Sequence, residues 1–385
     1  MRSDPMQSDR RLLHVINTLE VGGGATHLRL LLPRLAALGY SSGVIAGCDG
    51  PVGIELRKLG MSVKILGPLG LAAPVRLAAL LAPRRPDILH VHGGRAGLAG
   101  ALAGRATGTR PIVYTAHAFA FKRHLPPIQH AATVLAERAS CRLADAVICL
   151  SADDALAAAE RGIAPRTLAV IPNGIDPAAF PAAADRRAEF GLSPGVPVIG
   201  MIGRLVADKD PLTFVRAAAQ IRERVPNARF LLVGDGPLRP LAERETAALG
   251  LNGRLILTGT RPDIPEVLGT VDVMVMTSLW EGLPLILLEA MASRIPVVCS
   301  RLPTLAGVVE DGRTGLLVPP GDAAGFAAAV VELWKDPRRR QRMGDAARDR
   351  VAREYSIVRM VQQTDALYTK VLTARGGSLP RARFG

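Results

Sequence analysis

Two glutamates after an aliphatic run are the residues best suited to chemistry in this sequence. Glu281 and Glu289 are separated by seven residues and follow the run Val273–Met276, which is typical of a buried strand. Glu289 falls within an otherwise apolar helical pattern, where an unpaired carboxylate is costly. An acidic residue near a pyrophosphate site commonly accepts ribose hydroxyls. The pair therefore indicates a nucleotide site, although Glu281 alone would also suit a carboxylate that complements a helix dipole.

The turn between these glutamates has the composition of a phosphate-binding helix start. Gly282 permits a tight turn, and Pro284 suits the first position of a helix. Leu283, Pro284 and Leu285 would then open the helix, where unpaired backbone N–H groups and the helix dipole favour an anion. We expect this segment to contact nucleotide phosphates.

Two cations follow an earlier predicted strand. Arg204 lies just beyond the run Val198–Ile202, and Lys209 lies five residues further on. The guanidinium can bind two oxygens at once and the ammonium supplies a point charge, which suits a diphosphate; two ordinary loop cations are the alternative. Asp208 and Asp210 form an Asp-x-Asp pattern, but the lysine between them opposes Mg²⁺. We therefore expect no metal and no other cofactor.

Glycines follow two further predicted strands. Gly23 and Gly24 come after Leu12–Thr18, and we expect them to form a loop whose positive φ angles let backbone N–H groups approach a ligand. A plain strand-to-helix turn would have the same composition. Gly234 begins a Gly-x-Gly pattern, but Arg239 occupies the place of the third glycine of a dinucleotide fingerprint. We interpret Gly234 as part of a strand-end turn beside a nucleotide.

The histidines are concentrated in the N-terminal third of the chain. His90 and His92 alternate at the end of one predicted strand, and His117 follows the predicted strand Ile112–Thr115. No third ligand has a spacing suited to zinc, so we expect no metal site from these residues. Because His117 lies at the carboxyl end of a strand, we expect it to point toward a ligand cleft.

Aliphatic runs alternate with helical patterns along the chain, which predicts an α/β fold of two Rossmann-like domains facing each other across a cleft. Strand-like runs occupy residues 12–18, 42–46, 63–66, 88–91, 112–115, 146–150, 169–171, 198–202, 229–233, 255–258, 273–277 and 297–300. We expect domains at 1–180 and 190–355, with a helix over about 357–372 that packs back on the first domain. The Gly-, Ser- and Arg-rich segment 373–385 is expected to be disordered.

Composition limits the classes of partner. The net charge of +14 raises nucleic acid or an anionic membrane as partners. Aromatic residues make up only 4% of the chain, which disfavours base stacking, so we expect no nucleic-acid partner. The four cysteines form no C-x-x-C pair, no signal peptide is visible and no apolar run has membrane-spanning length. These features predict a cytoplasmic protein that is peripheral on the inner face of the cell membrane.

The positive charge is concentrated between Arg84 and Arg142, with nine Lys/Arg against two Asp/Glu. Lys122 and Arg123 precede a predicted helix, Pro126–Leu143, which has an apolar face that begins at Ile128. This face and the basic side chains would suit docking on an anionic membrane surface. Packing of the same face against the domain's own sheet is the alternative, and many of the basic residues would suit solvated helix faces.

Taken in order, these motifs resemble the family-4 retaining GT-B glycosyltransferases, the glycosyl transferases group 1, from about Leu12 to Lys370. The Glu281–Glu289 pair is the most specific mark. Thr26 stands where many members carry a glutamate, and the tract 115–150 resembles members that build bacterial exopolysaccharide or capsule repeats. Other segments that carry the resemblance are Thr115–His117, Ile171–Asp176, Gly203–Leu205, Val233–Pro237 and Asp311–Leu316.

The resemblance implies a metal-independent hexosyltransferase. It would move a hexosyl or N-acetylhexosaminyl group from a nucleotide-diphosphate sugar, with UDP favoured, to a saccharide on polyprenyl diphosphate, and would retain the anomeric configuration. The N-terminal domain would bind the acceptor and the C-terminal domain the donor. Gly23 and Gly24 would touch the distal phosphate of the donor, and His117 would contact the sugar near the reacting carbon.

The resemblance also implies roles in the C-terminal domain. Arg204 and Lys209 would neutralise the leaving diphosphate, where preorganised cations stabilise the charge that develops. Glu289 would hold the ribose, and Glu281 would contact hydroxyls of the transferred sugar.

Two other classes of protein share some of these features. A nucleotide-sugar epimerase can have the same two-domain architecture, but it should release free sugar without an acceptor. A non-enzymatic, basic nucleic-acid-binding protein should retain nucleic acid on a filter at physiological salt. The broken glycine fingerprint disfavours an NAD oxidoreductase.

Overall fold

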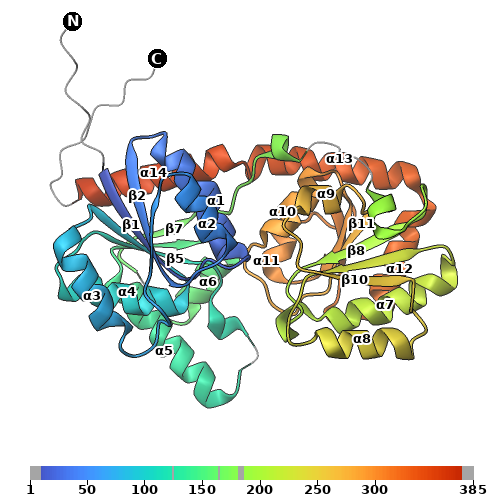
Figure 1. Ribbon diagram of the computed structural model, residues 1–385, viewed down its shortest axis with the longest axis horizontal. Helices are drawn as coiled ribbons and strands as arrows, with labels where there is room; N and C mark the ends of the chain where they lie inside the picture. The colour runs from blue at the N-terminus through green and yellow to red at the C-terminus, as the bar shows by residue number, and fades with distance from the viewer. Residues whose placement is uncertain (1–9, 124, 164, 181–185, 375–385) are drawn as a thin grey trace, which may run out of the picture. The chain divides into compact units, whose positions relative to one another are not determined.

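The computed structural model describes residues 10–123, 125–163, 165–180 and 186–374, and the chain divides into two units. One unit holds the chain up to Asn173 and again from Ile357, and the other holds Gly174–Ser356. Each unit has a fully parallel sheet with helices packed against it, so the predicted α/β class is confirmed (Figure 1). The predicted strands are all present, with ends shifted by at most two residues. Residues 375–385 of the tail expected to be disordered lie outside the described residues.

Seven strands form the sheet of the first unit, in the order β3-β2-β1-β4-β5-β6-β7. Their bounds are β1 Arg10–Thr18, β2 Tyr40–Cys48, β3 Ser62–Ile65, β4 Ile88–His92, β5 Ile112–Ala116, β6 Ala146–Cys149 and β7 Leu168–Val170. The order changes direction between β1 and β4, so the carboxyl ends of these two strands form the switch point of the sheet, where ligands of open α/β sheets bind.

Helices pack on both faces of this sheet. They are α1 Gly23–Ala36, α2 Pro51–Lys58, α3 Ala73–Arg84, α4 Gly94–Ala106, the 3-10 helix η1 Ala120–Lys122, α5 Pro127–Leu143, α6 Ala152–Glu160 and α14 Ile357–Thr373. One apolar core joins the sheet to α1 and α14, and a second core on the opposite face joins it to α3 and α4. The red helix α14 packs against α1 despite its distance along the sequence (Figure 1).

Six strands form the sheet of the second unit, in the order β10-β9-β8-β11-β12-β13. Its strands are β8 Val198–Ile202, β9 Arg229–Val233, β10 Leu255–Gly259, β11 Val273–Met276, β12 Val297–Ser300 and β13 Gly315–Val318. The sequence analysis missed β13, because four residues carry too little pattern and only pairing with β12 makes them a strand.

The helices of the second unit connect these strands and extend past the last one. They are η2 Pro177–Ala179, η3 Arg187–Phe190, η4 Ala207–Lys209, α7 Pro211–Arg224, α8 Arg239–Ala248, α9 Ile264–Leu268, α10 Leu285–Ala292, α11 Pro303–Ala306, α12 Ala323–Lys335 and α13 Pro337–Glu354. Helix α7 packs against α8 and α12, and α10 packs against α13.

The apolar face of helix α5 does not pack on the sheet as the alternative expected, and the basic segment before it is partly paired within the unit. Ile128 is 85% exposed and Leu135 is 69% exposed, so this apolar face does not pack on the sheet. The helix instead buries Glu137, which accepts a hydrogen bond from the Tyr114 hydroxyl at 2.7 Å. Lys122 was among the basic residues expected to suit docking on a membrane, but its Nζ pairs with two aspartates of α6. None of the helices in the described ranges has the length and apolar character needed to span a membrane.

Candidate active site

The carboxyl edge of the second sheet collects the residues that the sequence analysis selected. Strands β9, β8 and β11 are neighbours, and the sheet order changes direction between β8 and β11. Arg204 follows β8, Gly234 follows β9 and Thr277 follows β11. The structure thus brings together segments far apart in sequence at the switch point of this sheet.

Arg204 is held at this edge through its backbone. The N–H of Gly203 donates to the carbonyl of Val233 at 2.9 Å. Gly234 allows this close approach, since its φ is +132° and a Cβ added there would lie 1.9 Å from the Gly203 carbonyl oxygen. The Arg204 side chain is exposed, and no residue in the described ranges pairs with its guanidinium. Gly234 is therefore required for packing of this loop, which presents a cation that is open to a ligand.

Lys209 ends the 3-10 helix η4, which hydrogen bonds tie to the loop after β11. The Thr277 hydroxyl lies 3.0 Å from the carbonyl oxygen of Lys209 and 2.7 Å from that of Asp210. The N–H of Leu279 donates to the Asp208 carbonyl at 2.8 Å. Two strand ends therefore position the lysine jointly.

Lys209 and Glu281, for which the resemblance implied separate roles, form an ion pair. Lys209 Nζ contacts Glu281 Oε1, and the Ser278 hydroxyl donates to the same oxygen at 2.7 Å. Glu281 is only 7% exposed, and an unpaired carboxylate at that depth would be costly, so the pair keeps both charges in place before a ligand arrives. The sequence analysis missed the positions of Thr277 and Ser278, although two hydroxyl residues directly after a buried strand were a usable signal.

Asp210 has a structural role in the same loop. Its carboxylate caps α7, where Oδ2 accepts from the Thr213 hydroxyl at 2.6 Å and Oδ1 from the Thr213 N–H at 3.3 Å. The Asp-x-Asp pattern therefore includes a helix cap whose oxygens already have partners.

Pro284 is the residue before α10 rather than its first residue. Its ψ of 128° is extended, and the helix begins at Leu285. Because proline has no N–H, the free donors at this helix start begin at Leu285. Glu289 lies inside α10 among buried apolar residues and is 9% exposed.

Gly23 and Gly24 are the first residues of α1, not the expected loop. Gly22 precedes the helix with an extended φ of 171°, and none of these glycines has the left-handed φ that was expected. A Cβ added at Gly23 would meet nothing within 4 Å, whereas one at Gly24 would lie 3.5 Å from Nε2 of His117. The start of α1 also has no acidic residue in its first turn, which leaves it open to an anion.

Five histidines meet at the carboxyl end of the first sheet. His14 of β1 is opposite His90 of β4 in the strand register, and alternation places His92 on the same face. His27 comes from α1, and His117 follows β5. The first four are buried and His117 is half-buried. His117 therefore lies at a strand end as predicted, but within a cluster that the sequence analysis did not foresee.

Hydrogen bonds join three of the histidines into a row, and each of the other two bonds to residues outside the cluster. In the row, His14 Nδ1 lies 3.1 Å from His92 Nε2, and His92 Nδ1 lies 3.3 Å from His117 Nε2. His27 Nδ1 lies 2.9 Å from the Asn173 side-chain oxygen.

His90 forms hydrogen bonds to two residues outside the cluster. Its Nδ1 lies 2.6 Å from the Tyr368 hydroxyl of α14, and its Nε2 lies 2.7 Å from the Thr115 hydroxyl. The expectation that no third ligand accompanies His90 and His92 is wrong, because strand pairing brings a nitrogen of His14 within 4.8 Å of theirs. A metal bound by His90 would have to replace one of its hydrogen bonds.

Burial makes these imidazoles weak bases. Desolvation, followed by the proximity of His27, lowers the pKa of His14 and of His117 to about 3. Desolvation lowers the pKa of His27 to about 4, against a smaller raising effect of Asn173. Desolvation and neighbouring histidines hold the pKa values of His90 and His92 well below the usual 6.5. The cluster is therefore neutral at physiological pH.

We expect the stability of the protein to fall between about pH 7.5 and pH 5.5. In this range the histidines of the unfolded chain take up protons near their ordinary pKa of about 6.5, whereas the folded cluster stays neutral. The stability linked to these lowered pKa values is thus lost as the pH falls through the unfolded pKa of about 6.5 toward the folded values. Each histidine can lower the free energy of unfolding by up to about 1.4 kcal/mol per pH unit, so the total loss should reach several kcal/mol.

Thermal melts across this pH range test the expectation. His130→Gln changes a histidine of α5 outside the cluster and should show the same loss as wild type. A melting temperature of the wild-type protein that stays constant from pH 7.5 to pH 5.5 would contradict the expected loss of stability.

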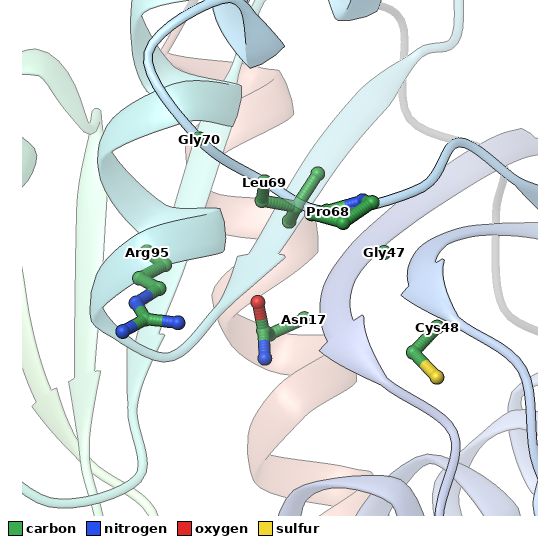
Figure 2. A pocket seen from close by; sticks show the side chains of 7 residues that line it. All are labelled: Asn17, Gly47, Cys48, Pro68, Leu69, Gly70 and Arg95. Atoms are coloured by element: carbon green, nitrogen blue, oxygen red, sulfur yellow. The ribbon is translucent and has the colours of Figure 1, made fainter.

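A pocket of about 330 Å³ opens at the carboxyl edge of the first sheet (Figure 2). Asn17 and Arg95 are its polar side chains, and Pro68 and Leu69 form an apolar wall. Arg95 is exposed in the first turn of α4, and no described residue pairs with it. A cation opposes the dipole at a helix start, so this position favours an anionic ligand. The sequence analysis missed both polar residues.

Comparison with known proteins identifies the family. Residues 21–179 match the profile of Glycosyltransferase Family 4, and residues 196–336 match that of Glycosyl transferases group 1. The UDP-Gal:alpha-D-GlcNAc-diphosphoundecaprenol alpha-1,3-galactosyltransferase of Escherichia coli is 32% identical over 76% of this chain and 78% of its own. The 2-deoxystreptamine glucosyltransferase of Streptomyces kanamyceticus is 34% identical over 78% of this chain and 82% of its own.

A solved structure shows the same fold. Anabaena Alr3699/HepE in complex with UDP and glucose has a TM-score of 0.84 at 22% identity, over 94% of this chain and 100% of that one. Together with the two Rossmann-like units, these matches show that the chain belongs to glycosyltransferase family 4 and is a glycosyltransferase of the GT-B fold.

Proposed function

We propose that this glycosyltransferase moves a hexosyl or N-acetylhexosaminyl group from a UDP-sugar to a saccharide on polyprenyl diphosphate, with retention of the anomeric configuration. The enzyme would act in the synthesis of cell-surface polysaccharide. The observation that carries the proposal is the pair of cations, Arg204 and Lys209, at the switch point of the second sheet. The names of two similar proteins support the substrates: the Escherichia coli relative uses UDP-Gal and a diphosphoundecaprenol acceptor, and HepE binds UDP and glucose.

In this proposal the second unit binds the donor. Arg204 and Lys209 neutralise the diphosphate as it leaves, because preorganised cations in such a site stabilise the charge that develops. Glu289 accepts hydrogen bonds from the ribose, and the N–H groups of Leu285 and Ile286 face the phosphates. Oε1 of Glu281 already accepts from Lys209 and Ser278, so Oε2 is the oxygen available to a sugar hydroxyl.

In this proposal the first unit binds the acceptor, and the start of its helix α1 faces a phosphate. Gly23 has neither a left-handed φ nor a close neighbour, so its lack of a side chain is best explained by a phosphate that approaches the start of α1. The pocket with Asn17 and Arg95 has the polarity to hold a polar or phosphorylated part of the acceptor.

The weak basicity of His117 supports retention. With a pKa of about 3, His117 is a poor base at neutral pH and is suited to donating a hydrogen bond instead. The acceptor proton then goes to an oxygen of the leaving phosphate. The bond from the anomeric carbon to that phosphate breaks with its electron pair, and the bond to the acceptor oxygen forms on the same face of the sugar.

Two variants separate catalysis from stability. Arg204→Ala should lower kcat about 10²–10³-fold, as loss of one preorganised donor does, without lowering the melting temperature, since Arg204 has no partner in the described ranges. Lys209→Ala should lower both, because it also leaves Glu281 buried without its cation. Lys335→Ala, on α12 of the same unit, is the control and should change neither. A folded Arg204→Ala enzyme with turnover close to that of wild type would refute this donor site.

Metal independence and retention can be tested in one reaction. We expect turnover to survive excess EDTA, because the cations supply the charge and Asp210 already caps α7. Loss of turnover with EDTA and its rescue by Mn²⁺ or Mg²⁺ would contradict this mechanism. NMR of the product should show the anomeric configuration of the donor, and an inverted product would rule out retention.

We further propose that α5 docks on an anionic membrane surface, where the lipid-linked acceptor lies. The exposed stripe of Ile128, Ala131, Ala132 and Leu135 supports this, as do the exposed Arg142 and the excess of basic residues between positions 84 and 142. Each basic side chain near such a surface contributes about 1 kcal/mol, and salt weakens the attraction. Lys122 has no part in this surface, because it is paired within the unit.

Vesicle sedimentation tests the docking. The wild-type protein should bind vesicles that contain anionic lipid at low salt, and the double variant Ile128→Ser/Leu135→Ser should bind at least about fivefold more weakly, since it loses apolar burial. Leu156→Ser removes a similarly exposed leucine from α6 and should leave binding unchanged. Equal binding to neutral and anionic vesicles, or no binding by the wild type, would exclude electrostatic docking.

A further inference from the structure

The row of His14, His92 and His117 has a defined direction of hydrogen bonding. The lowered pKa values leave each imidazole neutral, with one N–H and one lone pair. Each of the two bonds in the row joins one ring nitrogen to another. A neutral ring that donates through one nitrogen must accept through the other, so all donors along the row point the same way.

The buried end of the row selects the direction. His14 Nε2 is buried without a hydrogen-bond partner among the described residues. If the row donated toward His14, this nitrogen would carry a buried N–H with no acceptor. If the row donates away from His14, it carries only a lone pair. Buried N–H groups without an acceptor are rarer in proteins than buried acceptors without a donor, which favours donation away from His14.

We infer that His14 and His92 are positioning residues that hold His117 as its Nδ1–H tautomer. The Nδ1–H of His14 donates to Nε2 of His92, and the Nδ1–H of His92 donates to Nε2 of His117. The proton of His117 must then be on Nδ1, for which no described residue is a partner. His117 therefore presents a donor at the end of β5, suited to a hydroxyl or phosphate oxygen of the sugar donor, and does not present a lone pair.

Only the consequence for turnover rests on the proposed function, because the tautomer can be measured in the ligand-free enzyme. The full-length protein labelled with ¹⁵N-histidine should show His117 with a protonated Nδ1 and an unprotonated Nε2, with the resonances assigned through His117→Gln. Protonation at Nε2 instead would overturn the inference. This measurement on the wild type decides the matter even where a variant fails to fold.

A matched pair of variants tests the positioning role. His92→Leu removes the donor to His117 and should let His117 populate its Nε2–H tautomer, with kcat lowered about tenfold or more. His90→Leu removes a neighbouring buried histidine outside the row and should cost comparable stability while leaving the His117 tautomer unchanged. An unchanged tautomer in His92→Leu would overturn the role of His92. If the tautomer shifts but turnover does not, the inference stands and the proposed donor role of His117 fails.

Discussion

A polar group buried at the end of a parallel strand must find a partner or lose its charge, and both units of this enzyme are built around that constraint. Parallel strands collect their carboxyl ends along one edge, so residues that follow different strands meet there. In the second unit the constraint is met by pairing. Lys209 and Glu281 neutralise each other, and the hydroxyls of Thr277 and Ser278 satisfy the backbone and carboxylate oxygens around them.

In the first unit the buried histidines meet the same constraint because they are neutral. Its histidines are placed so deeply that they stay unprotonated, and all but a few of their ring nitrogens have partners from strands, strand ends or α14. This arrangement costs stability in acid, but it provides rigid imidazoles with defined tautomers at a strand end. The contrast suits a transferase, because charged groups stabilise a leaving group that gains negative charge, whereas neutral imidazoles offer positioned hydrogen bonds.

Long-range pairing also decides which charges are available to ligands. The charge of Lys122 is paired with aspartates of α6. The guanidinium groups of Arg204 and Arg95, which look similar in the sequence, have no partner among the described residues. Gly234 shows the same point for the backbone, since its lack of a side chain serves the approach of the Gly203 carbonyl. Residue type alone does not separate a structural cation or glycine from a functional one.

The order and type of the elements could be predicted from the sequence, because buried parallel strands need continuous aliphatic runs and these are visible locally. The positions of Arg204 and His117 at strand ends could be predicted for the same reason, and Lys209 and the Glu281–Glu289 pair lie in segments that follow such strands. Only the tertiary structure decided the partners: His14 beside His92, Lys209 on Glu281, and Lys122 turned inward. These contacts join residues far apart in sequence, and their energies depend on burial and strand register, which no local pattern records.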